Sequence, residues 1–79
     1  MRDEILELIK KNCGMIFGVD PSTLTDDTTF ASLDAKSANF VQISAALEDE
    51  YEVEVPFMQF RRNKTLGEAA DYVAELLGG

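Results

Sequence analysis

The chain has 79 residues, of which 15 are acidic and seven are basic, so its net charge near neutral pH is −8. A chain of this length buries only about 60–65% of the surface that it exposes when unfolded, so we expect one small domain, residues 1–79, without an enclosed enzyme cleft. The negative charge argues against nucleic-acid binding, which needs a basic surface, and favours attraction to basic patches on proteins.

Several residue types that mark other classes of protein are scarce. The chain has one cysteine and no histidine, which excludes an internal disulfide, a cysteine–histidine zinc site and the usual general base. We therefore expect neither an enzyme nor a metalloprotein. No apolar run approaches the length of a membrane span, and Met1-Arg2-Asp3-Glu4 lacks the apolar core of a secretion signal. These features predict a cytoplasmic protein without a membrane span, and we expect a monomer.

The first segment, from about Arg2 to Phe17, is predicted to be an amphipathic helix because its apolar residues recur at helical spacing. Asp3 and Glu4 in the first turn suit the helix dipole. Gly14 should weaken the helix by about 1 kcal/mol relative to alanine, and Gly18 should end it. The predicted apolar stripe consists of Ile5, Leu8, Ile9, Cys13, Ile16 and Phe17.

Residues 20–36 are rich in turn formers and are predicted to form a long loop, a kind of segment that often carries function. A second helix should then begin with Ser37 as its N-cap and run to about Tyr51. The residues expected to face the core are Leu24, Phe30 and Leu33 from the loop, and Phe40, Ile43, Leu47 and Tyr51, with Val41 and Ala46 alongside, from the helix.

The remainder of the chain predicts two more helices. Val53 and Val55 suggest a short extended piece that ends at Pro56, and residues 57–62 can form one or two helical turns. Thr65 and Glu68 have the spacing of a capping box at the start of a last helix. The predicted fold class is therefore all-α, a small four-helix bundle with a long first loop and a short third helix.

Four segments of the chain, residues 18–30, 33–38, 47–56 and 65–73, follow one another in an order and spacing that resemble the acyl carrier protein family. Leu33-Asp34-Ala35-Lys36-Ser37-Ala38 falls where acyl and peptidyl carriers have Leu-Gly-x-Asp-Ser-Leu. Leu47-Glu48-Asp49-Glu50-Tyr51-Glu52-Val53-Glu54-Val55-Pro56 is similar to their Leu-Glu-x-x-Phe-x-x-x-Ile-Pro segment. The resemblance covers nearly the whole chain without large gaps.

The resemblance implies a role for Ser37. In the family, a phosphopantetheinyl transferase moves 4′-phosphopantetheine from coenzyme A to this serine. The thiol of the arm then carries acyl groups as thioesters between acyl-loading and acyl-transferring enzymes, and the carrier itself performs no chemistry. A phosphodiester at Ser37 would lie beside the unpaired N–H groups of a helix start, which favour an anion.

The chain departs from the family around this serine. Lys36 replaces an aspartate, Ala38 replaces a leucine and Asp34 replaces a glycine. Asn39 and Gln42 are uncharged where fatty-acid carriers are acidic, which favours a specialised lipid or secondary-metabolite pathway. The residues expected to contact partner enzymes are Lys36, Ala38, Asn39, Gln42, Met58, Arg61 and Arg62, of which methionine and arginine are enriched at interfaces.

Two questions stay open at the level of sequence. The fold could instead serve as an unmodified protein-interaction module in which Ser37 is only a helix cap. Phe57 and Phe60 could complete the core, or the short third helix could form a specialised partner contact.

Overall fold

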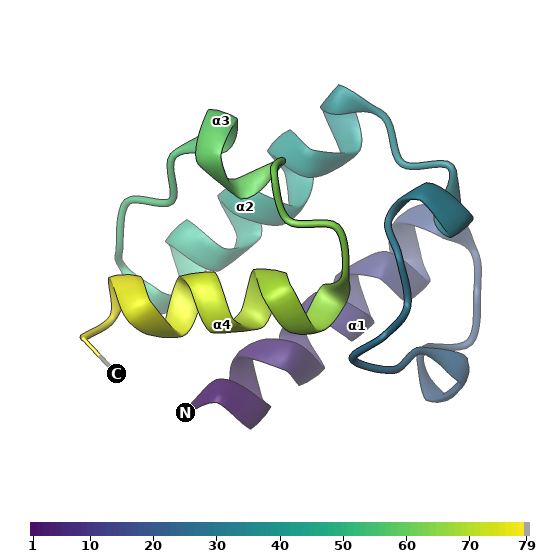
Figure 1. Ribbon diagram of the computed structural model, residues 1–79, viewed down its shortest axis with the longest axis horizontal. Helices are drawn as coiled ribbons and strands as arrows, with labels where there is room; N and C mark the ends of the chain where they lie inside the picture. The colour runs from purple at the N-terminus through teal and green to yellow at the C-terminus, as the bar shows by residue number, and fades with distance from the viewer. Residues whose placement is uncertain (79) are drawn as a thin grey trace.

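The computed structural model describes residues 1–78 and confirms the predicted all-α fold (Figure 1). Three longer helices, α1 (Arg2–Phe17), α2 (Ser37–Tyr51) and α4 (Leu66–Leu76), are accompanied by the short α3 (Phe57–Phe60). The N-terminus and the end of α4 lie on the same side of the bundle in Figure 1. Within the described residues, no helix is long and apolar enough to cross a membrane.

The core lies where the three longer helices meet. The predicted stripes supply most of it, and Ile5, Ile9, Ile43, Leu47 and Val73 are fully buried. Leu6, which the predicted stripe omitted, is also buried. The whole buried set is Ile5, Leu6, Ile9, Cys13, Leu24, Phe30, Ile43, Leu47, Val55, Phe60, Leu66, Ala69, Ala70 and Val73.

The loop between α1 and α2 is ordered by backbone hydrogen bonds to the start of α4. The N–H groups of Leu66 and Gly67, which have no partner inside α4, donate to the carbonyls of Thr28 (3.0 Å) and Asp26 (2.9 Å). Two 3₁₀ turns, Pro21–Thr23 and Ala31–Leu33, shorten the irregular stretches between these contacts. The loop is therefore a structured layer over one end of the bundle.

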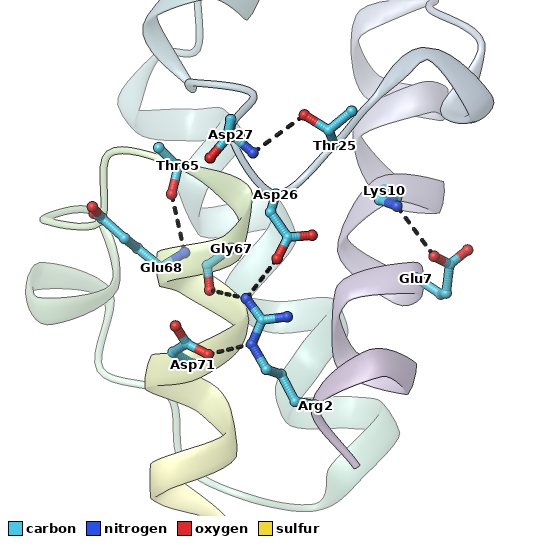
Figure 2. Close-up of polar contacts among 10 residues, drawn as sticks. All are labelled: Arg2, Glu7, Lys10, Thr25, Asp26, Asp27, Thr65, Gly67, Glu68 and Asp71. Carbon is cyan, nitrogen blue, oxygen red and sulfur yellow. Dashed lines mark hydrogen bonds and ion pairs between the residues drawn. The ribbon is translucent and has the colours of Figure 1, made fainter.

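The side chain of Arg2 connects the first turn of α1 to the loop and to α4. Figure 2 shows its guanidinium pointing between the loop and α4, where it donates to Asp71, to Asp26 (2.9 Å) and to the Gly67 carbonyl (3.3 Å). Hydrogen bonds to Asp71 and then Asp26 raise the pKa of Arg2 above its ordinary value. The first turn of α1 is thus fixed to both neighbours.

The predicted capping box at α4 is half formed. The Thr65 hydroxyl accepts from the Glu68 N–H at 3.1 Å, as expected (Figure 2). The Glu68 carboxylate reaches back to the N–H of Lys64 at 2.8 Å, one residue earlier than a capping box requires.

Gly14 marks a close approach between α1 and the loop. A β-carbon at this position would lie 2.6 Å from the Pro21 Cγ and 3.0 Å from the Val19 carbonyl oxygen. Contacts this short force the neighbouring ring or backbone to move. The glycine that weakens α1 locally is therefore needed for tertiary packing.

We predict that Gly14→Ala destabilises the protein by about 1–3 kcal/mol, although helix propensity alone would stabilise it by about 1 kcal/mol. Urea unfolding followed by circular dichroism measures the difference. Pro21→Ala should recover part of the loss in a Gly14→Ala background, because it removes the ring atoms that clash. A Gly14→Ala variant more stable than the wild type would show that the contact is not tight.

Candidate functional site

Ser37 is the first residue of α2, and its side chain is exposed to solvent. The prediction that Ser37 caps the helix is wrong, because the N-cap residue is Lys36. The Lys36 N–H donates to the side-chain oxygen of Asn39 at 2.8 Å, so the Asn39 side chain satisfies the backbone N–H of the N-cap residue. Among residues 1–78, the Ser37 hydroxyl has no hydrogen-bond partner. The hydroxyl is therefore both accessible and unused by the fold.

The backbone beside Ser37 suits a negatively charged group. The Lys36 carbonyl accepts from the N–H groups of Asn39 (2.9 Å) and Phe40 (3.2 Å). The N–H groups of Ser37 and Ala38 belong to the first turn, where a helix supplies no carbonyl partner. These donors and the positive end of the helix dipole favour a phosphate on the Ser37 oxygen.

Three aromatic rings anchor the start of α2. The ring centroids of Phe30 from the loop and Phe40 from α2 are 4.8 Å apart, and Phe60 from α3 lies 6.4 Å from the first and 6.3 Å from the second. The tilted and edge-to-face geometries are those that aromatic pairs prefer. This cluster holds the loop, α2 and α3 together directly behind the exposed serine turn.

The aromatic cluster shows which of the two phenylalanines of α3, Phe57 or Phe60, completes the core. Phe60 is fully buried, whereas Phe57 is only half-buried. The guanidinium carbon of Arg61 lies 5.7 Å from the Phe57 ring centroid, which is a cation–π distance. Phe60 therefore belongs to the core, and Phe57 lies at the edge between the core and the surface of α3.

The turn before Ser37 has a backbone conformation that suits glycine at residue 34. Asp34 has φ 56° and ψ 40°, in the left-handed region that glycine enters freely and aspartate tolerates better than most residues. Its carboxylate accepts from the Lys36 Nζ at 2.8 Å. The cation next to the serine is thus offset by the carboxylate two residues earlier, although both groups are exposed and the pair adds little stability.

The structure places most of the predicted contact residues on the surface around α2 and α3. Ala38 and Gln42 lie on the exposed face of α2, and Met58, with 59% of its surface exposed, lies on α3. Arg61 and Arg62 follow α3 and are also exposed. Asn39 is half-buried, and its amide is engaged with the Lys36 N–H and, at 3.4 Å, with Gln42.

Val41 is a surface residue that sequence reasoning assigned to the core side of α2. Its side chain is 48% exposed. At about 100° per residue, Val41 lies more than a quarter turn away from the centre of the stripe formed by Phe40, Ile43 and Leu47. Helical geometry could therefore have separated it from the buried stripe.

A shallow groove of about 380 Å³ lies at the other end of α2, lined by Glu4, Glu7, Leu8, Lys11, Glu50 and Tyr51. Burial, followed by the charges of Glu4 and Glu50, raises the pKa of Tyr51. Ser37 and Tyr51 are separated by the length of α2, roughly 21 Å at 1.5 Å per residue. The groove is therefore not part of the serine site.

Cys13 is fully buried, and burial raises the pKa of its thiol to about 11. The thiolate, which is the reactive form, is therefore both inaccessible and scarce at neutral pH. We predict that the folded protein does not react with an aromatic disulfide reagent at pH about 8 and that urea exposes one thiol per chain. Rapid reaction of the folded protein would contradict the buried position of Cys13.

Comparison with known proteins adds independent findings. A family model described as "Phosphopantetheine attachment site" matches residues 3–73. The chain is 36% identical to an acyl carrier protein of Lactobacillus acidophilus, over 90% of each chain, and 35% identical to one of Rubrobacter xylanophilus, over 94% of this chain and 93% of the other. A free-standing peptidyl carrier protein from Acinetobacter baumannii shares the fold, with a TM-score of 0.85 and 22% identity over 96% of this chain and 95% of its own.

Proposed function

The chain belongs to the acyl carrier protein family, and we propose that it carries acyl groups as thioesters on a 4′-phosphopantetheine arm attached to Ser37. Proteins of this family are carriers with a covalently attached 4′-phosphopantetheine. One observation on this chain supports Ser37 most directly. Its hydroxyl is exposed at the first residue of α2 and has no hydrogen-bond partner among the described residues.

The proposed loading step uses the Ser37 hydroxyl as a nucleophile. Its oxygen forms a new bond to the phosphorus that carries the pantetheine part of coenzyme A, and the bond between this phosphorus and the adenosine bisphosphate part breaks. The hydroxyl proton leaves to a base of the transferase, since this chain has no histidine to accept it. The first-turn N–H groups of α2 then lie next to the new phosphodiester.

The arm supplies the thiol to which an acyl group binds as a thioester. The chain's own contribution is to hold Ser37 on a fixed helix start and to present a surface to the enzymes that act there. The packing of Phe30, Phe40 and Phe60 provides the rigid support. The surface that partners contact comprises Lys36, Ala38, Asn39, Gln42, Met58, Arg61 and Arg62.

The partners that we propose are a phosphopantetheinyl transferase and acyl-loading and acyl-transferring enzymes. A specialised lipid or secondary-metabolite pathway is supported by the uncharged start of α2, since fatty-acid carriers are acidic there. The unpaired cysteine supports a reducing compartment such as the cytoplasm. We also propose that the carrier acts as a monomer.

The alternative is an unmodified interaction module on the same fold. That account gave Ser37 a structural role as a helix cap, and the cap is formed by Lys36 and Asn39 instead. Ser37 then has no described structural role. The carrier is therefore the account that the geometry favours.

The residues that flank Ser37 provide a test of recognition by the transferase. We predict that Lys36→Asp with Ala38→Leu speeds loading by about twofold to thirtyfold and leaves the loaded residue unchanged. Exchanging a mild repulsion for a mild attraction at an exposed contact is worth about 0.4–2 kcal/mol in total. Intact-mass measurement of time points, with coenzyme A and a broad-specificity transferase, gives the rate.

The matched control is Lys11→Asp, which reverses a charge in the groove beside Tyr51, at the end of α2 away from Ser37, and should leave the rate unchanged. A double variant that loads at the wild-type rate would show that this transferase does not read residues 36 and 38. Loading at a residue other than Ser37 would contradict the proposed site.

A further inference from the structure

Lys36 is the charged residue closest in sequence to Ser37. It is the N-cap residue of α2, and Ser37 is the first residue of the helix. Residues 37–47 contain no charged side chain, in a chain in which 28% of residues are charged. A negative charge added at Ser37 would therefore meet one cation beside it and no acidic side chain along the next three helical turns.

The backbone of Lys36 is fixed, whereas its side chain is free to move. The backbone N–H donates to the Asn39 side-chain oxygen at 2.8 Å, and the carbonyl accepts from the N–H groups of Asn39 (2.9 Å) and Phe40 (3.2 Å). The side chain is 70% exposed and has a flexible four-carbon stem. The ammonium group can therefore change its partner without any change in the fold.

The partner of this ammonium group is the Asp34 carboxylate, at 2.8 Å. The Asp34 side chain is 85% exposed, so water can replace Lys36 there without leaving a buried charge. An exposed ion pair of this kind favours the paired state by only about 1.4-fold to fivefold. The pair is therefore easily exchanged for another.

A phosphodiester at Ser37 would compete with Asp34 for the ammonium group. Neighbouring Cα atoms are about 3.8 Å apart, which is less than the reach of the lysine stem. The first-turn N–H groups of α2 and the positive end of its dipole draw the same phosphate towards the helix start. A hydrogen bond between the ammonium group and the phosphate is charge-assisted and hence stronger than a neutral one.

We propose that Lys36 binds the phosphodiester of an arm attached to Ser37, and that Asp34 gives up the ammonium group when the arm is loaded. The phosphate end of the arm is then held at the start of α2, while the rest of the arm stays free to reach enzymes. The inference rests on the proposed function, because it requires the arm at Ser37. It gives Lys36 a role within the loaded chain, separate from its recognition by the transferase.

The two roles of Lys36 have opposite signs. Lys36→Asp should speed loading by a transferase that prefers an acidic residue there, as proposed above. The same substitution places a second negative charge beside the phosphodiester, so it should loosen the loaded arm. Faster loading combined with a looser arm is a result that a merely structural role of Lys36 does not predict.

NMR of the loaded protein tests the inference. Isotope-labelled protein receives an unlabelled arm from coenzyme A and a broad-specificity transferase. An isotope-filtered NOE between the ε-methylene hydrogens of Lys36 and the arm methylene next to the phosphate reports the contact, and phosphorus transverse relaxation reports how firmly the phosphate is held. We expect this NOE in the wild type and slower phosphorus relaxation in Lys36→Gln. The difference should shrink from low to moderate salt.

Three further variants make the comparison specific. Asp34→Asn should strengthen the NOE by about 1.4-fold to fivefold because it removes the competing carboxylate. Asparagine tolerates the left-handed backbone at residue 34, where φ is 56°, so the turn is kept. Lys36→Arg retains the charge and should keep the wild-type relaxation rate. The matched control is Lys11→Gln, which removes a cation in the groove beside Tyr51 and should leave the rate unchanged.

The inference is overturned if the wild type shows no NOE between Lys36 and the arm. It is also overturned if the phosphorus relaxation is the same in the wild type, Lys36→Gln and Asp34→Asn. Intact mass confirms loading before each measurement. A wild-type protein that takes up no arm refutes the proposed function, whereas a loaded arm that moves independently of residue 36 refutes the inference about Lys36 alone.

Discussion

Phe60→Ala should lower the free energy of unfolding by about 3–5 kcal/mol, the largest loss that we expect from a single substitution in this chain. Phe60 is the largest of the fully buried side chains, and its ring packs against Phe30 and Phe40. Truncation would leave a cavity where the loop, α2 and α3 meet. Because small domains have only about 5–15 kcal/mol of stability, the variant should be close to unfolding at physiological temperature.

Urea unfolding of Phe60→Ala and Phe57→Ala gives a matched comparison on one short helix. Phe57 is half-buried, so its truncation should cost less than half as much. Phe60→Leu retains most of the volume and keeps the measurement possible if the alanine variant does not fold. Similar losses at both positions, or a loss below about 1 kcal/mol at Phe60, would mean that α3 packs through its other face.

Ser37→Ala should abolish loading completely while leaving stability within about 0.5 kcal/mol of the wild type. The loss of function follows because no other atom at the start of α2 can form the phosphodiester. The stability should hold because the Ser37 hydroxyl makes no hydrogen bond among the described residues. Intact mass after incubation with coenzyme A and transferase measures loading, and urea unfolding measures stability.

Ser32→Ala is the matched control, since Ser32 is also exposed and lies in the loop just before the site. This control should load like the wild type. A Ser37→Ala protein that still gains an arm would move the attachment site elsewhere. A Ser37→Ala protein that unfolds would restore the structural role that the geometry denies this serine.

Periodicity predicted the helices well because each one buries a continuous face. The bounds of α1, Arg2–Phe17, and the end of α2 at Tyr51 agree with the pattern of apolar residues. Val41 was misassigned because hydrophobicity, rather than its angle around the helix, placed it near the core.

The start of α2 could not be predicted in detail because two residues, Ser37 and Asn39, can each cap the helix through different backbone N–H groups. Serine is a good N-cap, and the sequence alone therefore favours Ser37. The Asn39 side chain instead accepts from the Lys36 N–H, at 2.8 Å, and Lys36 becomes the N-cap residue. The local sequence allows both solutions, so only the folded geometry shows that the serine hydroxyl is left free.

The order of the long loop depends on contacts that are distant in sequence. The bonds from Leu66 and Gly67 to the loop carbonyls join segments about 40 residues apart, which local turn propensity does not report. The same holds for Gly14, whose role depends on the ring of Pro21. Local propensities consider each segment separately. They therefore predicted an irregular loop and a glycine that only destabilises α1.

Loading of the wild-type protein tests the central claim most directly. Purified protein is incubated with coenzyme A and a broad-specificity phosphopantetheinyl transferase, and both its intact mass and its reactive thiols are measured. Because Cys13 is buried, with a pKa of about 11, a new fast-reacting thiol must come from the arm. The account predicts a mass gain of one phosphopantetheine on the peptide that contains Ser37, together with one fast thiol per chain. It is contradicted if the wild type and the Lys36→Asp, Ala38→Leu variant both stay unmodified in a mixture in which a standard carrier protein is loaded.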